Sequence, residues 1–417
     1  MLTPAGPPVA PRCPVPAPAR FPFAPGPAMA PPVEYADLLD GDGLTPVTLP
    51  SGSPALLVTR HADVRTVLGD PRFSRAAYTA KPMFARERDS LALALSDPPD
   101  HTRRRRAVAA AFTARRARDS VPRIRALAAE LIAAMRAAGP PVDLVEAYAV
   151  PLPLTVICEL LGITVEDGAR CRPWMSAMMS THRYPPEEVA RAHRRMAGHL
   201  ADLVDQRWRA VRAGAPADGL LAELARPGPD DATLSRDEAV AMGAGLLMAG
   251  YETTANQLAS CVWLLLAERG RWERLRADPG LVDGAIEEMV RLTSLNATGG
   301  APHVALEDVP LSAGLVRAGQ VVVPLVDAAG RDPEVFADPA DLDLTRSPNP
   351  HLGYGHGRHH CLGAPLARVE LQVGVASLLA ELPGLRLAVP SDEVDWRTDM
   401  FIRGPWRLPV TWDGAAR

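Results

Sequence analysis

The pattern of apolar and polar residues predicts a mainly α-helical protein with a minor β part. From His61 onward, apolar residues recur at helical spacing along most of the chain, as they do on helices that bury one face. Strand-like segments interrupt this pattern at 45–59, where a turn rich in Pro, Gly and Ser predicts a hairpin, and at 304–326. Shorter helices are predicted at residues 122–139, 186–213, 281–293 and 365–382.

The longest predicted helix begins at residues 235–238, Ser-Arg-Asp-Glu, which form a capping box. No proline follows before Gly270, so one helix of roughly 35 residues, about 52 Å long, can form at a rise of 1.5 Å per residue. A soluble helix of that length normally crosses a whole domain.

The N-terminus differs in composition from the rest of the chain, because 12 of its first 32 residues are proline. This composition predicts an extended, polyproline-like arm over residues 1–32 that carries no catalytic chemistry. Nothing after the arm resembles a linker, and 47% hydrophobic with 23% charged residues is enough for a sizeable core. We therefore expect one domain over residues 33–417.

Charge and cysteine usage exclude several classes of function. The net charge of -4 gives no overall basic field, so we expect neither nucleic acid nor a membrane among the partners. No stretch of 18 uninterrupted apolar residues is present. The five cysteines lie far apart without a CxxC pair, which argues against a disulfide framework and a thiolate zinc site and favours a cytoplasmic protein.

The most informative segment is 351–370, HLGYGHGRHHCLGAPLARVE. Its glycines allow close approach of the backbone to a flat partner, and Pro365 stands where a helix would begin. Cys361 thus precedes a helix N-terminus, which should stabilise a thiolate and lower the thiol pKa from ~8.5 toward the physiological range. Such a thiolate is a metal ligand or a nucleophile, whereas the other four cysteines are interpreted as small buried apolar residues.

The segment YGHGRHHCLG resembles the haem-binding loop of the cytochrome P450 family, F-x-x-G-x-[HR]-x-C-x-G. The matching positions are Tyr354, Gly357, His359, Cys361 and Gly363. The resemblance implies a haem b cofactor with Cys361 as the iron ligand and with Tyr354, Gly355 and His359 at the cofactor. Tyr354 departs from the family pattern, which has Phe there, and its hydroxyl needs a partner and could change the redox potential.

Two residues of EEMVR, Glu288 and Arg291, match the ExxR motif of the family. Without the resemblance they would be an ordinary surface pair on a helix, worth a few tenths of a kcal/mol. In the family this motif belongs to an ion-pair network completed by a later arginine. That arginine is Arg346 in this chain.

In the long helix, AGYETT at 249–254 is similar to the oxygen-activation motif [AG]-G-x-[DE]-T-[TS]. The resemblance implies that Gly250 leaves room for dioxygen, that the Thr253 hydroxyl donates a hydrogen bond during oxygen activation, and that Glu252 links the site to solvent protons. The alternative is that the small residues serve close helix packing.

DPPDHTRRRR resembles the family segment that contacts a haem propionate, with His101 and Arg105 as the carried-over ligands. In GGAPHVALEDV, His303 stands where the family usually has an arginine that clamps a propionate. A propionate would raise the histidine pKa above ~6.5, so we predict a clamp that titrates between about pH 6 and 8, or else a His303 that faces the substrate. Further arginines at 103, 104, 106, 115, 116 and 118 form either a docking surface for an acidic electron donor or a solvated basic face.

Together the motifs predict the cytochrome P450 fold, in which the long helix crosses the domain over the haem. The expected activity is a monooxygenase that hydroxylates an apolar or aromatic small molecule or peptide, of the kind found in secondary metabolism, with O2 and electrons from ferredoxin and ferredoxin reductase. Alternatives are epoxidation, oxidative aryl coupling of an aromatic peptide, or a catalytically silent haem protein, against which the Glu252-Thr253 pair argues. The segments expected to face the substrate are 72–95, 173–186, the helix near Met248, and Met400 with Phe401.

Overall fold

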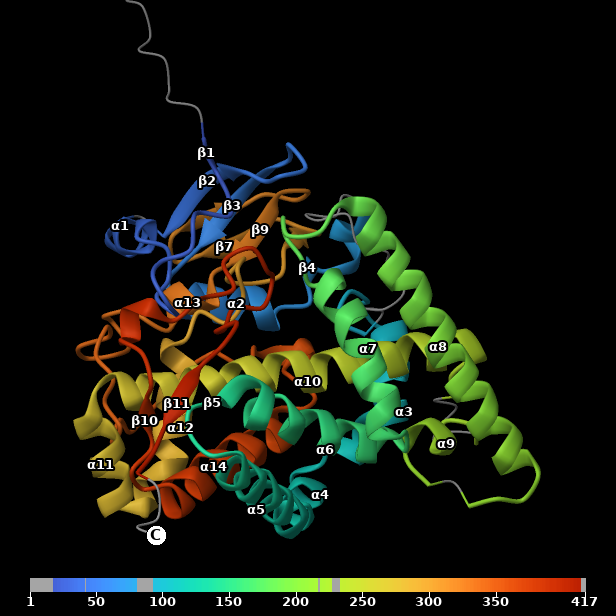
Figure 1. Cartoon of the computed structure of the whole chain (residues 1–417). Coiled ribbons are helices and arrows are strands. Elements are labelled where there is room, and N and C mark those ends of the chain that lie inside the picture. Colours follow the sequence, from blue (N-terminus) through green and yellow to red (C-terminus); the bar gives the residue numbers. More distant parts are fainter. Residues whose placement is uncertain (1–17, 42, 81–92, 217, 227–232, 414–417) are drawn as a thin grey trace, which may run out of the picture.

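The long helix is the central element of the fold. The computed structural model describes residues 18–41, 43–80, 93–216, 218–226 and 233–413. Helix α10 covers Arg236–Ala267, and Ser235 with Glu238 forms the predicted capping box at its start. Its 32 residues span about 48 Å, and it crosses the width of the molecule in Figure 1. The predicted central helix is therefore confirmed.

Helices surround α10 on several sides (Figure 1). The helices before α10 are α1 (Glu34–Asp40), α2 (His61–Gly69), α3 (Asp100–Ala109), α4 (Ala114–Asp119), α5 (Val121–Ala138), α6 (Pro151–Leu161), α7 (Val165–Met178), α8 (Pro186–Arg212) and α9 (Leu220–Glu223). Those after it are α11 (Arg269–Ala277), α12 (Val282–Leu292), α13 (Val326–Ala329) and α14 (Ala364–Glu381). The four shorter predicted helices correspond to α5, α8, α12 and α14, with ends within a residue or two of the prediction.

The minor β part is gathered mainly in one six-stranded sheet with the order β1-β2-β3-β9-β6-β4. The strands are β1 (Ala19–Arg20), β2 (Leu44–Thr48), β3 (Pro54–Val58), β4 (Phe73–Ser74), β5 (Val142–Asp143), β6 (His303–Ala305), β7 (Val309–Leu311), β8 (Gly314–Val316), β9 (Val321–Pro324), β10 (Arg386–Leu387) and β11 (Pro409–Thr411). Strands β2 and β3 form the predicted antiparallel hairpin, with Leu44 opposite Val58. Strand β6 pairs with both β4 and β9, which joins the segment after β4 to the segment around His303.

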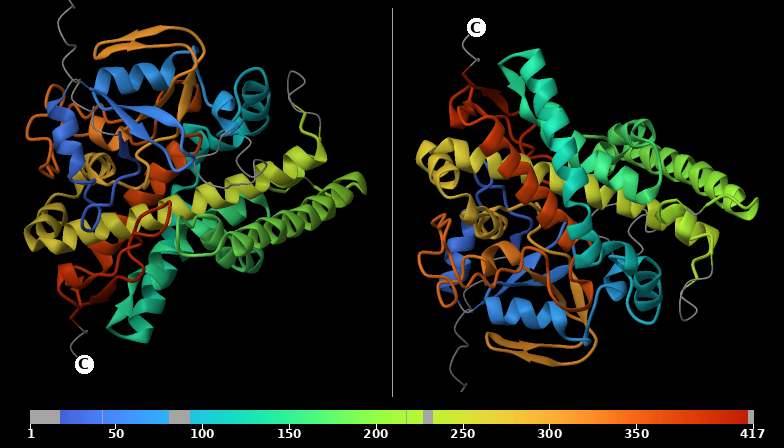
Figure 2. Two further views of the ribbon diagram at one scale, coloured as in Figure 1. Left: turned by 90° about the horizontal axis from the view of Figure 1, so that it is seen from above. Right: turned by 90° about the horizontal axis from the view of Figure 1, so that it is seen from below.

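Two apolar cores lie along opposite halves of α10. The C-terminal half, with Leu258 and Val262, packs with residues of α5, α12 and α14. The N-terminal half, with Leu246 and Leu247, packs with residues of α6, α7 and α8. Figure 2 shows α8 running beside the N-terminal half of α10. The centre of α10 thus lies between the two cores, and this centre carries the AGYETT motif.

The predicted arm lies partly outside the described residues, and its described part is packed onto the protein. Strand β1 pairs in parallel with β2, and Phe21 and Met29 are buried. The guanidinium group of Arg403 donates hydrogen bonds to three carbonyl groups of this segment, at residues 26, 28 and 30. The end of the arm is therefore held against the sheet.

Among the described residues, no single helix is both long enough and apolar enough to cross a membrane. The segments 145–161 and 165–178 pass such a test of length and composition only as a pair, and they are bent by 116°. Many of their apolar residues belong to the two cores described above.

Candidate active site

The loop before α14 presents Cys361 at the wall of a cavity. The turn at Gly357–His359 precedes it, and the backbone N–H of Cys361 donates to the Tyr354 carbonyl at 2.8 Å. Gly357 has a φ of +67°, and a Cβ there would lie 2.6 Å from the carbonyl oxygen of Leu68. Only glycine fits this approach of the loop to α2, and Gly355 also has a positive φ of +74°.

The predicted lowering of the Cys361 pKa is wrong for the polypeptide alone. Burial among protein atoms raises the pKa of this thiol, although the sulfur faces the cavity. Hydrogen bonds to the N–H groups of Gly363 and Ala364 and the charge of Arg105 lower it, but they do not outweigh the desolvation. The helix start thus contributes in the predicted direction, but desolvation outweighs it in the polypeptide.

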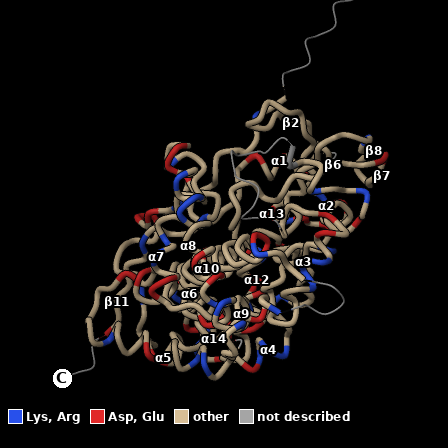
Figure 3. Tube along the Cα trace, turned by 90° about the vertical axis from the view of Figure 1, so that its right-hand side faces the viewer, with Lys and Arg blue, Asp and Glu red and all other residues tan. Residues whose placement is uncertain are grey.

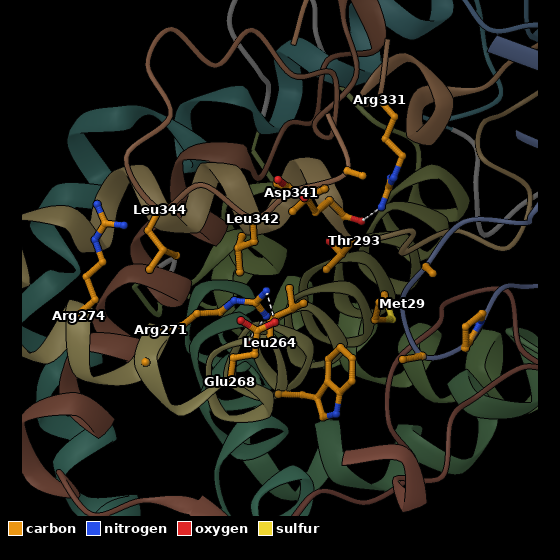
Figure 4. A pocket seen from close by; sticks show the side chains of 17 residues that line it. Met29, Leu264, Glu268, Arg271, Arg274, Thr293, Arg331, Asp341, Leu342 and Leu344 are labelled. Atoms are coloured by element: carbon orange, nitrogen blue, oxygen red, sulfur yellow. Dashed lines mark hydrogen bonds and ion pairs between the residues drawn. The ribbon is translucent and has the colours of Figure 1, made fainter. Parts of the chain in front are cut away.

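Two adjoining cavities meet at Cys361, with volumes of about 340 and 240 Å³. Residues that line both of them are Arg75, Thr253, Thr254, His359, Cys361 and Ala367. A larger cavity of about 710 Å³ lies elsewhere, between α11, the end of α10 and the segment 27–30 (Figure 4). Cys361 does not line that cavity. Two arginines that do line it have partners within the protein: Arg271 pairs with Glu268, and Arg331 donates to the Leu292 carbonyl. The chemistry therefore belongs to the two smaller cavities.

Basic side chains line these cavities together with Cys361. The rings of His101 and His359 lie 4.4 Å apart, and the guanidinium group of Arg105 donates to the His360 carbonyl at 2.9 Å. The Nε2 atoms of both histidines are buried and have no hydrogen-bond partner among the described residues. The predicted residues His101, Arg105 and His359 are thus brought together, and they are joined by Arg75, which the motifs did not indicate.

His303 does not form the predicted titrating clamp. It is 2% exposed and is not among the lining residues of either cavity. Its Nδ1 bonds the Ala301 carbonyl at 2.8 Å, and its Nε2 bonds Nε of Arg75 at 3.1 Å. Burial, and then the charge of Arg75, lower the His303 pKa to about 3, so the ring is neutral between pH 6 and 8. The alternative that His303 faces the substrate is not supported either, because the ring is enclosed.

The centre of α10 places Thr253 at both cavities. Its hydroxyl donates to the Ala249 carbonyl one turn earlier, at 2.7 Å, a bond that a threonine can exchange for an external acceptor. Gly250 also lines one cavity. A Cβ on Gly250 would lie 2.8 Å from the Ile157 side chain, so the space left by this glycine admits α6. The packing alternative for Gly250 therefore has direct structural support.

Glu252 points to a different side of α10. It is 2% exposed and forms an ion pair with Arg397 at 2.5 Å. Arg397 also donates to the side chain of Asn256 at 3.0 Å and lies over the ring of Trp406. A cavity of about 350 Å³ is lined by Glu252, Arg397, Arg172 and Tyr251. The helix thus separates a carboxylate in a polar cavity from a hydroxyl at the Cys361 cavity.

The residues of the ExxR motif are buried and form a network with Arg346, which is largely buried. The Glu288 carboxylate accepts two hydrogen bonds of 2.7 Å from Arg291 and two of 3.0 and 3.1 Å from Arg346. Arg291 also donates to the carbonyl groups of residues 330, 339 and 341. The network therefore ties α12 to the chain that leads into the Cys361 loop.

Tyr354 stands where the family has a phenylalanine and therefore adds a hydroxyl group at this position. Its oxygen is buried without a hydrogen-bond partner among the described residues, and burial raises the Tyr354 pKa well above its usual value. The Arg368 guanidinium lies 4.2 Å from the ring centroid and is bound in turn by Glu287. The tyrosine is thus a neutral, cation-covered ring beside the cysteine loop.

The comparisons with known proteins agree with this geometry. A family model described as Cytochrome P450 matches residues 273–392. Mycinamicin IV hydroxylase/epoxidase from Micromonospora griseorubida is 42% identical to this chain over 91% of the chain and 94% of its own length. The chain belongs to the cytochrome P450 family. Nocardicin C N-oxygenase from Nocardia uniformis subsp. tsuyamanensis is 43% identical, again over 91% of this chain and 94% of its own.

A solved structure described as HinD with NMFT and NO resembles this P450 with a TM-score of 0.89 and 45% sequence identity. The match covers 95% of this chain and all of the solved one. As a P450, the protein is a monooxygenase whose cofactor is a haem with thiolate-ligated iron. The mainly helical P450 fold predicted from the sequence is confirmed.

The site residues of this P450 fit a haem. The two unpartnered histidine Nε2 atoms and the two arginines that line one of the cavities match the carboxylates of haem propionates. Cys361 and Thr253 of α10 line the same two cavities. Cys361 would ligate the iron, and His101, Arg105 and His359 would hold the propionates.

The sequence motifs did not single out two charged residues of the P450 site, Arg75 and Arg397. Neither belongs to a motif, and each reaches the site from a distant segment. Of the segments expected to face the substrate, the cavities include Arg75, Leu93, Ala94 and Phe401, together with Leu246 and Ala249 of the helix near Met248, while 81–92 lie outside the described residues. Met248 and Met400, like the methionines of 173–186, belong instead to an apolar core.

Proposed function

We propose that this P450 hydroxylates a mainly apolar organic molecule of secondary metabolism, with O2 and with electrons from a ferredoxin and its reductase. The observation that carries the proposal is the combination of Cys361 and Thr253 at one apolar-walled cavity with Glu252 at a polar one. When bound, the haem supplies the oxygen chemistry. The polypeptide supplies substrate contacts, proton delivery and a docking surface.

The substrate side of the cavity is lined by small and apolar residues. They include Leu93, Leu246, Ala249, Leu295 and Phe401. Such a lining excludes water and favours an apolar or aromatic substrate, oriented by few polar contacts. The cavity walls alone are compatible with hydroxylation, epoxidation and aryl coupling.

Proton delivery is assigned to the two sides of α10. Glu252 lines the polar cavity, where Arg397 holds its carboxylate in an ion pair, and it is the proposed entry point for solvent protons. Thr253 lines the two cavities with Cys361, where its hydroxyl would hold and donate a proton. A silent haem-binding protein has no use for a buried acid and a hydroxyl on two sides of one helix turn.

Thr253→Ala should divert reducing equivalents from product to hydrogen peroxide, because the hydroxyl that donates to oxygen is lost. Product formed per electron consumed should fall roughly 100-fold, the lower end of what general acid–base groups contribute. Thr253→Ser, which keeps the hydroxyl, should stay close to wild type. Peroxide and product are measured together, and equal coupling in Thr253→Ala and wild type would remove Thr253 from proton delivery.

The reaction class is tested by incubating the purified protein with ferredoxin, its reductase, NADPH and 18O2. Candidate substrates come from a panel of terpenoids, macrolides and short aromatic peptides that is first screened for substrate-induced spin shifts. One 18O atom in the product supports hydroxylation or epoxidation, and loss of two hydrogens without 18O identifies aryl coupling. Spin shifts without any turnover would identify the silent binder.

Electron delivery is assigned to exposed arginines of α3 and α4, near the Cys361 loop. Figure 3 shows basic positions on both helices. Arg103 and Arg104 are unsuitable, because both pair with Glu238. Arg106, Arg116 and Arg118 are exposed, and none of them has a side-chain partner among the described residues. These three residues form the proposed docking surface for an acidic ferredoxin.

Arg116→Glu and Arg106→Glu should slow reduction by ferredoxin, and the defect should shrink as salt screens the charges. Each charge reversal at the rim should lower the rate several-fold, with little change in haem content. Arg195→Glu on α8, with the same charge change at another exposed arginine, serves as the control. Stopped-flow reduction at several salt concentrations measures the effect, and equal rates in all four proteins would leave the arginines as a solvated face.

A further inference from the structure

Arg75 lines both cavities of the site, whereas Arg105 lines only one of them. Arg75 directly follows strand β4. His303, which stands where the P450 motif usually has an arginine, lines neither cavity. The sheet explains how the two meet, because β4 pairs with β6 and β6 begins at His303. A segment far away in the sequence thus places a guanidinium group beside the position that lacks one.

The hydrogen bonds of His303 show which of its two ring nitrogens carries the hydrogen. The Ala301 carbonyl can only accept, so Nδ1 of His303 carries a hydrogen. The Nε group of Arg75 can only donate, so Nε2 of His303 carries a lone pair. Both ring nitrogens are therefore in use, and the neutral ring has no donor left for a propionate.

Arg75 keeps donors for another partner. Its Nε is bound to His303, and Nη1 donates to the Ala94 carbonyl at 3.3 Å. Nη2 has no partner among the described residues. The nearby carboxylate is Asp97, which is bound by the Ser74 hydroxyl at 2.5 Å and lies 4.0 Å from His359. A cation at the cavity wall with free N–H groups is suited to a carboxylate from within the cavity.

We propose that Arg75 binds a haem propionate in this P450 and that His303 positions it by accepting its Nε hydrogen bond. Arg75 thereby replaces the arginine that the family usually supplies at position 303. His303 acts only through Arg75, so it is a positioning residue. The proposal depends on the haem cofactor and on no particular substrate.

The first test compares Arg75→Leu, Arg75→Lys and the control Arg72→Leu. Arg72 has an Asp70 partner on the same short segment but lines neither cavity. Transfer of haem to excess apomyoglobin should be roughly 10- to 100-fold faster for Arg75→Leu, the range expected for a lost charge-assisted hydrogen bond. Arg75→Lys should lie between Arg75→Leu and wild type, and Arg72→Leu should match wild type. The reduction potential of Arg75→Leu should be lower, because a cation near the haem stabilises the added electron.

The second test concerns His303. His303→Leu should lose haem faster than wild type, and His303→Gln, which retains an acceptor for Arg75, should recover most of the difference. The double variant Arg75→Leu with His303→Leu should be no worse than Arg75→Leu alone, since the two act as a unit. His303→Arg should also lose haem faster, because it sets two buried cations side by side.

Opposite outcomes would overturn the proposal. If His303→Arg held haem more tightly than wild type while Arg75→Leu had no effect, position 303 would itself be the propionate site. If His303→Gln were as impaired as His303→Leu, the ring would serve packing alone. Should Arg75→Leu fail to fold, Arg75→Lys and His303→Gln still distinguish the cases, because unchanged haem transfer and potential in Arg75→Lys would contradict the proposed contact of Arg75 with the propionate.

Discussion

Cys361→Ser should abolish the red-shifted Soret band that the reduced wild-type protein shows with carbon monoxide. The band reports a thiolate ligand on the haem iron, and serine offers a hydroxyl of similar size that is a far weaker ligand. The backbone around the position should persist, because Gly355, Gly357 and the start of α14 are unchanged. Any remaining haem should show the ordinary band of a neutral ligand, and turnover should be lost.

The matched control is Cys261→Ser, a buried cysteine on α10 that lines neither cavity. It should keep the red-shifted band even if its stability is reduced. Difference spectra and haem content are recorded for the three proteins. A Cys361→Ser protein with the wild-type band would show that another group ligates the iron.

The sequence predicted those elements whose signals are local. The capping box at Ser235 and the absence of proline to Gly270 define α10 within a few residues. Pro365 and the glycine-rich loop likewise locate the start of α14 beside Cys361. Each of these features depends on residues that are neighbours in the chain, so a motif contains all the information needed.

The features that sequence could not predict depend on distant segments. Arg75 meets His303 only because β4 and β6 share a sheet, and Arg397 reaches Glu252 from the C-terminal region. The run of arginines in the sequence predicts a basic face that includes Arg104, but in the structure Arg104 forms an ion pair with Glu238 of α10. The thiol pKa of Cys361 was predicted from its helix start alone, whereas desolvation by the surrounding fold outweighs that contribution.

Glu288→Gln should cause a large loss of stability. Both side chains of the Glu288–Arg291 pair are 0% exposed, and that of Arg346 is 10% exposed. The carboxylate also accepts hydrogen bonds from Asn349 and from the backbone of Asp343. A neutral amide would leave two buried guanidinium groups without a counter-charge, which typically costs about 3–5 kcal/mol. That is a large part of the roughly 5–15 kcal/mol that stabilises a folded domain.

The same contacts predict how the effect depends on pH. Burial raises the Glu288 pKa, but the hydrogen bonds from Arg291 and Arg346 outweigh it, so the pKa is lowered in the folded protein. A carboxylate with a lowered pKa stabilises the fold above its unfolded pKa of ~4.3 and loses this contribution as the pH falls through the folded value. The difference between wild type and Glu288→Gln should therefore be complete at pH 7 and shrink in acid.

Urea unfolding of the haem-loaded proteins at pH 7 and at acidic pH measures this difference, together with the haem content after expression. The neighbouring Glu287→Gln is the matched control, because Glu287 pairs with Arg368 and His351 but is 25% exposed at its side chain. Its loss should cost less, since water can solvate the partners that remain. If the two variants were equally stable, the buried network would contribute no more than a surface pair. The tie between α12 and the Cys361 loop would then have to come from apolar packing alone.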